Sequence, residues 1–397
     1  MTTLKTDVAV AGAGLAGLAL ALELAQTGRR VVLLERRRRP GGAVGTLPGG
    51  ADQGIHLFLS GFTRCLALVE RLGSRQLLRD LGPRCRVAWG ERDLTLPLGA
   101  SRPRTLLELA RLGREGLHLA ASLIRMKPKV DDDSLAATFW REWALSVFNA
   151  PLELLDGALL QRTAAAVLGD PRRHRPMVAA TNLEELWVAP FERALAAAGV
   201  RLLTGTALRA VECCGNRVSA FLAEGLRVEA RHFVWAGPPE GLRELAGLSD
   251  VAPPMPSRRL GRHIVNLIAP VAGLPPEGLC GWFGAPFQWL FPAGPGQVVL
   301  VGSGWSDENL ARRGAAPALL PALLARHGLR PAGTPLWIVQ RHATHLQSPD
   351  FEAARPGPGT ALENLHLCGA WLRTGLPLSM ESALAGAGLT ARKLQFE

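Results

Sequence analysis

Apolar and polar positions near the start of the chain follow a clear order. An apolar run, Val8 to Ala11, leads into a glycine-rich turn and then a helical run that ends at Thr27. Gly28 stops the helix, and a second apolar run, Val31 to Leu34, is closed by Glu35. This alternation predicts a βαβ unit, with two parallel strands joined by a crossover helix.

The turn of this unit has the pattern G-x-G-x-x-G. Gly12 permits the tight turn, Gly14 lets backbone amides approach a pyrophosphate, and Gly17 lets the helix pack on the strand. The helix N-terminus favours phosphate charge. Glu35, 18 residues after Gly17, is expected to bond the adenosine ribose hydroxyls. The dinucleotide contacts expected in the turn are Gly12, Gly14, Leu15, Ala16 and Gly17.

The same stretch has an alternative interpretation, because it is nearly uncharged from Val8 to Ala25 and resembles a signal sequence or membrane span. Asp7 stands where a signal sequence carries positive charge, and Glu23 interrupts the run. The second strand then follows with the expected acid. We therefore favour the nucleotide-binding unit.

Hydrophobic periodicity also predicts the later elements. Helices are expected at 63–72, at 105–126 as a pair, after Ser134, at 192–198, at 315–326 and at 382–394. Strands are expected as a hairpin over 83–97 and at 200–203, 207–213, 218–222, 232–236, 259–268, 281–283, 289–291, 298–302, 336–341 and 365–368. The nucleotide-binding pattern returns after a long interruption, so its domain is predicted to be discontinuous.

The predicted class is α/β, with a Rossmann-like domain into which an α+β substrate domain is inserted. The nucleotide domain is expected at 1–78, 189–250 and 351–397. The inserted domain is expected to be helical over 79–188 and to form a mostly antiparallel sheet over 251–350.

Length and charge narrow the class further. The chain has 397 residues, which is long for a single core, and 48% of them are hydrophobic. A net charge of +11 invites a nucleic-acid interpretation. The arginines are scattered, however, and no basic helix or aromatic RNA-binding signature accompanies them, so no nucleic acid is expected as a partner. A basic surface also suits an anionic membrane face.

The six cysteines form no C-x-x-C pair and have no histidine at metal-ligand spacing. Buried, reduced thiols in a cytosolic protein are expected, and no metal site.

Two short polar segments after the first unit are candidates for chemistry. The basic run Arg36 to Arg39, followed by Gly41 and Gly42, is placed beside the cofactor phosphates, although a solvated charge run is the alternative. The segment Asp52-Gln53-Gly54-Ile55-His56 has ordinary turn composition. Its position directly after a nucleotide-binding unit favours a site.

Aromatic residues concentrate in two places. One group, on a predicted helix and its end, comprises Trp140, Trp143, Phe148 and Asn149. It either packs a core or lines an apolar pocket for a long hydrocarbon. The second group is expected to give the inserted sheet an aromatic face and comprises Trp282, Phe283, Phe287, Trp289, Phe291 and Trp305. From these groups the predicted substrate-pocket residues are Trp140, Trp143, Phe148, Asn149, Trp282 and Trp289.

Several motifs together resemble the flavin-containing amine oxidase and phytoene desaturase superfamily, and within it the squalene-associated FAD-dependent desaturases, which dehydroxylate hydroxysqualene. The resemblance covers nearly the whole chain. It rests on Gly12 to Gly17, Asp52 to His56, Trp143 to Pro151, Arg341 to Thr344, Arg355-Pro356, Trp371, and Thr374 to Glu381. Two positions depart from the usual pattern, because Ala43 and Ala370 replace polar residues of the family.

The resemblance implies an FAD cofactor and a hydrophobic isoprenoid substrate, with reduced FAD replacing an allylic hydroxyl by hydride. The donor that reduces the flavin is left unidentified. The helix that opens near Met380 is an anion site, expected to face the pyrimidine edge of the flavin. The remaining expected cofactor contacts are Gly54, Gly237, Gly369, Ala370, Leu376 and Met380.

Two other functions stay open at this point. One is a carotenoid or phytoene-type desaturase or an amine oxidase of the same superfamily. The other is a non-catalytic lipid-binding flavoprotein, or one that has lost FAD because of Ala43 and Ala370.

The reaction needs an acid that helps the hydroxyl leave. His56 is the first candidate, because imidazole titrates near neutral pH, and Asp52 is expected to orient it or raise its pKa. Glu381 is the alternative, although a helix N-terminus favours its ionised form.

The leucine-rich segment 105–126 is followed by Lys127 and Lys129. It packs in a core or docks on an anionic membrane. The expected location is the cytoplasm, with peripheral attachment to the inner face of the cytoplasmic membrane.

Overall fold

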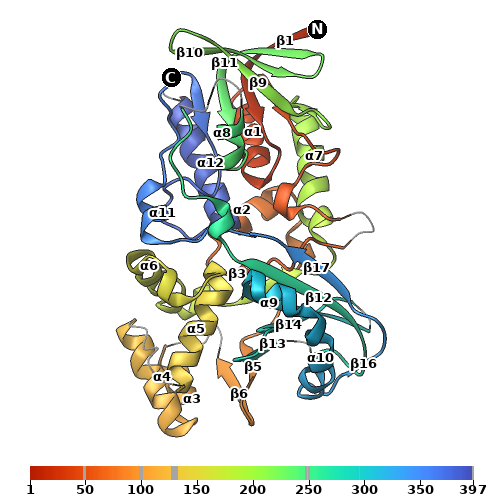
Figure 1. Ribbon diagram of the computed structural model, residues 1–397, viewed down its shortest axis with the longest axis vertical. Helices are drawn as coiled ribbons and strands as arrows, with labels where there is room; N and C mark the ends of the chain where they lie inside the picture. The colour runs from red at the N-terminus through yellow and green to blue at the C-terminus, as the bar shows by residue number, and fades with distance from the viewer. Residues whose placement is uncertain are drawn as a thin grey trace.

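A computed structural model describes residues 1–47, 51–97, 102–126, 133–245, 248, 251–276, 278–294 and 296–395. Two large sheets organise these residues, one toward each end of the long axis in Figure 1. Both described ends of the chain lie beside the first sheet.

The first sheet has a parallel centre and an antiparallel edge. Its strands lie in the order β8 (Arg201–Leu203), β2 (Val31–Leu34), β1 (Thr2–Ala11), β11 (Leu226–Trp235), β10 (Arg217–Ala223) and β9 (Leu208–Cys214), and β18 (Leu365–Leu367) pairs with the end of β11. The pairs β1–β2, β2–β8, β1–β11 and β11–β18 are parallel. This arrangement confirms the predicted Rossmann-like class.

The centre of this sheet is buried on both faces, which explains its unbroken apolar runs. In β1, Val8 and Val10 pack on one side, and Ala9 and Ala11 pack on the other. The helices around this sheet are α1 (Leu15–Gln26), α2 (Thr63–Arg71), α7 (Ala189–Ala197), α8 (Pro239–Glu244), α11 (Pro349–Ala354) and α12 (Met380–Gln395). A π-helical turn, Glu184–Val188, precedes α7.

The second sheet is mostly antiparallel, as predicted. Its strands lie in the order β16 (Arg330–Pro331), β12 (His263–Ala272), β15 (Gln297–Trp305), β14 (Trp289–Pro292), β13 (Leu279–Phe283), β5 (Arg84–Trp89) and β6 (Arg92–Pro97), and β17 (Leu336–Gln340) pairs with β12. Only β13 and β5 pair in parallel among its described strands. The hairpin 83–97 therefore joins the strands from 263–340 in one sheet.

The expected single aromatic face of this sheet is wrong. Trp282, Phe287 and Trp305 pack in the core on one side, whereas Phe283, Trp289 and Phe291 belong to the core on the other. Trp282 and Phe283 are consecutive in β13, and consecutive strand residues point to opposite faces. The aromatic side chains therefore serve two cores.

Helices α3 (Arg102–Ala110), α4 (Gly113–Arg125), α5 (Leu135–Phe148) and α6 (Gly157–Leu168) gather beside the second sheet, at the lower left of Figure 1. Ser134 caps α5 by accepting a hydrogen bond from the backbone N–H of Ala137. Two further helices, α9 (Asp307–Ala311) and α10 (Ala316–Ala325), lie against the second sheet's strands.

A third, small sheet was not predicted. It consists of β3 (Phe58–Leu59), β7 (Pro176–Ala179) and β4 (Leu78–Asp80). The five-segment division of the chain into domains stays our proposal. Within the described part of the chain, every helix is too short or too polar to span a bilayer.

Candidate active site

A cavity of about 2000 Å³ lies between the two sheets. One wall contains the C-terminal ends of parallel strands, at Ala11, Leu34 and Trp235. In open α/β sheets, ligands bind at this edge. The opposite wall includes apolar residues of the second sheet: Ile264, Trp289, Phe291, Val301 and the β17 segment 336–339. The sheet edge that is expected to bind a nucleotide and the apolar face of the second sheet therefore line the same cavity.

The glycine turn fits a dinucleotide. Gly12 has a φ of +110°, and a Cβ there would lie 2.9 Å from the backbone carbon of Ala236. A Cβ on Gly14 would meet no atom within 4 Å, and Gly14 lines the cavity. Gly17 does not line it. A Cβ there would lie 2.0 Å from the Gly12 oxygen, so Gly17 serves the close packing of helix on turn.

Glu35 is buried at the end of β2 and lines the cavity. Its carboxylate accepts hydrogen bonds from the backbone N–H groups of Ala13 and Arg37, both at 2.8 Å. The carboxylate thus fixes the glycine turn to the second strand. Contact with a ribose stays a prediction.

The loop after β2 completes this end of the cavity. Arg36, Gly41 and Gly42 line it, as expected. Gln53 also lines it, and its amide donates to the carbonyl oxygens of Gly42 at 2.9 Å and Gly45 at 3.2 Å. No pattern in the sequence assigned a role to Gln53, and the structure shows that it supports the glycine loop.

The remaining expected cofactor residues divide into two groups. Gly54 does not line the cavity, because it lies against the second sheet, where a Cβ would be 2.9 Å from the Asn266 amide nitrogen. The expected residues that do line the cavity, besides those above, are Leu15, Ala16, Gly237, Gly369, Ala370, Leu376 and Met380. Ala43, one of the two departures from the family pattern, lines it as well.

His56 lines the cavity, but its expected titration near neutral pH is wrong. Burial lowers the pKa of His56 to about 4, against a hydrogen bond with the Ala43 backbone that raises it. The expected support from Asp52 is wrong too. The Asp52 carboxylate accepts from the Leu183 backbone N–H at 2.9 Å, and burial raises the Asp52 pKa to about 6. Asp52 does not line the cavity, so it anchors the segment before α7.

Glu381 is engaged elsewhere. Its carboxylate accepts from the backbone N–H groups of Arg64, at 3.0 and 3.1 Å, and of Cys65, at 3.0 Å. These amides belong to the first turn of α2, where N–H groups lack helical partners. Glu381 therefore caps α2 and joins it to α12, although it also borders the cavity.

Only two of the six predicted substrate-pocket residues line the cavity. Trp289 does so and donates its indole N–H to the Ser146 hydroxyl at 2.7 Å. Asn149 does so while its amide group bonds the Arg262 carbonyl oxygen at 2.8 Å and the Gly304 N–H at 2.7 Å. The expectation is wrong for the other four, which pack in hydrophobic cores away from the cavity: Trp140, Trp143, Phe148 and Trp282.

A histidine without a predicted role, His342, also lines the cavity. Its backbone has a φ of +46°, and its N–H donates to His263 Nδ1 at 3.0 Å. Since Nδ1 of His263 accepts, its Nε2 carries the proton and donates to Asp307 at 2.9 Å. Arg258 Nε donates to the His342 carbonyl oxygen at 2.6 Å.

One ring nitrogen of His342, Nδ1, is engaged in a hydrogen bond within the protein. Nδ1 lies 3.2 Å from the Gly261 carbonyl oxygen, which can only accept, so Nδ1 is the donor. No residue within the described ranges bonds the ring's Nε2. In the sequence, His342 stands out only as part of the segment Arg341 to Thr344 that resembles the family. The residues that fix its position, Arg258 and His263, are distant in sequence, so no local pattern indicates its role.

The chain belongs to the family of flavin-containing amine oxidoreductases, whose sequence pattern matches residues 15–271. It is an FAD-dependent oxidoreductase, and the open space at Gly14 beside the basic Arg36 loop suits that cofactor.

Relatives of known name match over nearly their whole length. The hydroxysqualene dehydroxylase of Rhodopseudomonas palustris is 27% identical over 98% of both chains, and that of Sinorhizobium fredii is 25% identical over 97% of both. The structure of putrescine oxidase bound to putrescine covers 100% of both chains with a TM-score of 0.71 at 18% identity, a likeness of fold.

Proposed function

We propose that this enzyme removes the hydroxyl group of hydroxysqualene reductively and releases squalene, in the biosynthesis of hopanoid-type triterpenes. The observation that carries the proposal is the size and composition of the cavity. Its volume of about 2000 Å³ exceeds the ~300–1,000 Å³ of ordinary ligand sites, which leaves room for a long hydrocarbon beside FAD. The similarity to two hydroxysqualene dehydroxylases over whole chains supports the same substrate class.

The chemistry of the proposed reaction requires the cavity walls to exclude water and to stabilise positive charge. The carbon–oxygen bond breaks, the hydroxyl leaves as water after taking a proton, and the carbon takes a hydride in its place. FAD in its reduced form supplies that hydride. The apolar wall formed by Ile264, Phe291, Val301 and β17 excludes water, which would otherwise recapture an allylic cation. The Trp289 ring on the same wall favours positive charge near its face.

The proton is best assigned to His342. A histidine with a pKa near 4, such as His56, is neutral at neutral pH and lacks the proton that departure of water requires. His342 lines the same cavity, and two backbone hydrogen bonds fix its position: its N–H donates to His263, and its carbonyl oxygen accepts from Arg258. His56 stays a candidate for orienting substrate or cofactor.

The test uses FAD-loaded protein that has been photoreduced without oxygen and mixed with hydroxysqualene. We expect squalene, identified by mass spectrometry, in an amount that approaches the amount of reduced flavin. Oxidised protein treated in the same way is the control and should give none. Absence of squalene from reduced, fully loaded protein would refute the proposal, and dehydrogenation of phytoene by the oxidised form would favour the desaturase alternative.

A further inference from the structure

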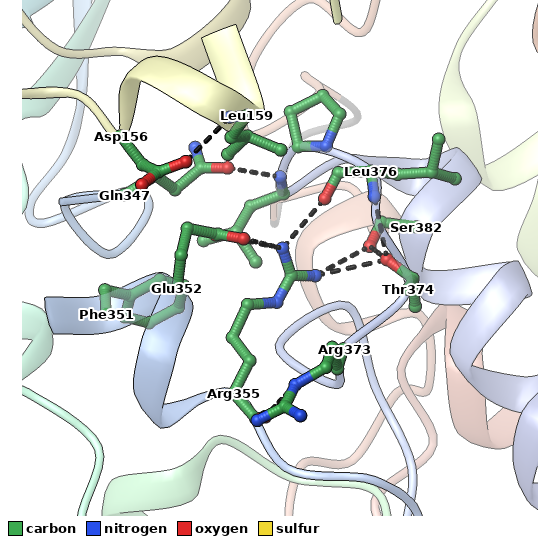
Figure 2. Close-up of polar contacts among 12 residues, drawn as sticks. Asp156, Leu159, Gln347, Phe351, Glu352, Arg355, Arg373, Thr374, Leu376 and Ser382 are labelled. Atoms are coloured by element: carbon green, nitrogen blue, oxygen red, sulfur yellow. Dashed lines mark hydrogen bonds and ion pairs between the residues drawn. The ribbon is translucent and has the colours of Figure 1, made fainter. Parts of the chain in front are cut away.

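A buried arginine organises the loop between β18 and α12. The side chain of Arg355 has an exposed fraction of 0%, and each of its five N–H bonds has an acceptor. Figure 2 shows its contacts with Glu352, Thr374 and Leu376. One partner is the carboxylate of Glu352, at 3.0 Å from Nη1. Four further acceptors belong to the loop: the carbonyl oxygens of Ala370 at 2.8 Å, Leu372 at 2.9 Å and Leu376 at 2.9 Å, and the Thr374 hydroxyl at 3.1 Å. The Ser382 hydroxyl, in α12, lies 3.5 Å from Nη2.

These four acceptors occupy every second position from 370 to 376. The loop therefore curls around a single guanidinium group. Its backbone carbonyls lack the partners that a helix or sheet would supply, and buried carbonyls need partners. Arginine meets this need because its planar fork offers five donors in fixed directions, whereas lysine offers three donors from one point.

The same loop is a wall of the FAD cavity. Residues 369–371 and 375–380 line the cavity. Because a trans peptide points its C=O and the next N–H in opposite directions, the Ala370 carbonyl bonded to Arg355 directs the N–H of Trp371 away from the guanidinium. Arg355 therefore determines which polar atoms the loop presents on its other side.

Further bonds tie the loop to its surroundings. Ser382, in the first turn of α12, donates to the Ala370 carbonyl oxygen at 2.9 Å and lies 2.8 Å from the Thr374 hydroxyl. Gln347 is fully buried and accepts from the Leu378 N–H at 2.8 Å (Figure 2). These bonds within the chain fix the shape of the loop.

We propose that Arg355 is a positioning residue for the cofactor: it holds residues 369–379 in the shape that receives FAD and thereby sets FAD affinity. A wall shaped in advance binds more tightly, because binding does not have to order it. This inference rests on the FAD cofactor and on the lining of the cavity. It is independent of the reaction proposed above.

The test compares FAD dissociation constants of apoprotein by fluorescence titration. Arg355→Gln and Arg355→Lys should both bind FAD at least about tenfold more weakly than the wild type. At saturating FAD their visible absorption bands should be displaced, which a loss of fold stability alone would not produce. Arg373→Gln is the matched control, since Arg373 is exposed in the same loop and donates to the Arg355 carbonyl oxygen at 3.0 Å.

Wild-type affinity in Arg355→Lys would overturn the proposal, because a point charge would then suffice. Affinities of Arg355→Gln and Arg373→Gln within about twofold of each other, with a lower melting temperature only in the former, would reduce Arg355 to a structural role. If Arg355→Gln does not fold, FAD binding by Thr374→Val tests the proposal instead. It removes one loop acceptor with little change in shape and should weaken FAD binding about threefold to tenfold, whereas wild-type binding and spectrum would overturn the proposal.

Discussion

The carboxylate of Glu35 accepts a hydrogen bond from the backbone N–H of Ala13 at 2.8 Å. The end of the second strand and the glycine turn, 22 positions apart, are therefore one unit. We therefore expect Glu35 to act on the cofactor through the shape of the turn as well as by direct contact.

Replacement of Glu35 should weaken FAD retention. We expect Glu35→Ala to raise the FAD dissociation constant about 10- to 100-fold, since bonds to a charged group contribute about 1.5–3 kcal/mol. Equilibrium dialysis with FAD is the measurement, with circular dichroism as the check on folding. Glu224→Ala, at an exposed turn of the same sheet, is the control. Unchanged retention in folded Glu35→Ala would contradict the assignment.

His56 and His342, two of the histidines that line the cavity, should respond differently to substitution. We expect His342→Asn to slow the single-turnover reaction of photoreduced enzyme by ~10²–10⁴-fold, the range of general acid catalysis. Asparagine tolerates the positive φ of this position, so the backbone is kept. His56→Asn should cost about tenfold or less, because a neutral imidazole contributes only an ordinary hydrogen bond. The reverse order of losses, with FAD bound in both variants, would return the acid role to His56.

Glu142 should make stability depend on pH. It is buried in α5, accepts from the Gly284 N–H at 2.8 Å, and burial raises its pKa from 4.5 to about 7. The unfolded chain releases this proton at lower pH than the folded chain, so the stabilising contribution of the protonated form is lost as pH rises from 4.5 to 7.

Glu142→Gln should remove this pH dependence and stabilise the protein at pH 8 by about 3 kcal/mol at most. Urea unfolding at pH 5 and pH 8 measures the effect, with Glu153→Gln, an exposed neighbour, as the control. Equal pH slopes in the wild type and Glu142→Gln would show that the carboxyl ionises normally.

Helices α3 and α4 should bind an anionic membrane surface. Leu107, Leu117 and Ile124 are 57%, 54% and 67% exposed, and the last two are seven residues apart on one helical face. Arg114 and Arg125 on α4 are exposed as well. Lys127 and Lys129, which the sequence also predicts to meet the membrane, lie outside the described residues.

Sedimentation with anionic liposomes at low salt should carry the protein down, and Leu117→Glu with Ile124→Glu should reduce the bound fraction severalfold. Leu274→Glu is the control, because Leu274 is 91% exposed but follows β12 in the second sheet and is not part of α3 or α4. Failure to sediment at low salt would make this face part of an ordinary soluble surface.

The first βαβ unit could be predicted from local sequence alone. A tight turn and a close approach of the backbone to a ligand each require glycine, which explains Gly12 and Gly14, and an acid is expected at the end of the second strand, where Glu35 stands. The same was true of the Ser134 cap. The aromatic face failed for a reason that the sequence contained, since Trp282 and Phe283 are adjacent in one strand and point to opposite faces.

Other features depend on contacts that no local pattern encodes. Glu381 meets the first turn of α2 across more than 300 residues, so its role as a cap could not be inferred from its own helix. The pKa of His56 depends on its burial in the folded chain and on a hydrogen bond with the Ala43 backbone. The strands β3 and β4 are only two and three residues long, and they form because β7 lies between them.

The parallel pairing of β1 with β11 sets an order of events during synthesis. β1 and the glycine turn are made first, but β11 begins at Leu226, and the loop held by Arg355 follows β18. A parallel pair so distant in sequence must close a long loop before its contacts stabilise it. FAD can therefore be enclosed only after translation has passed Met380. A nascent chain stalled before β18 would leave the end of β11 without its parallel partner and would still lack a complete cofactor site.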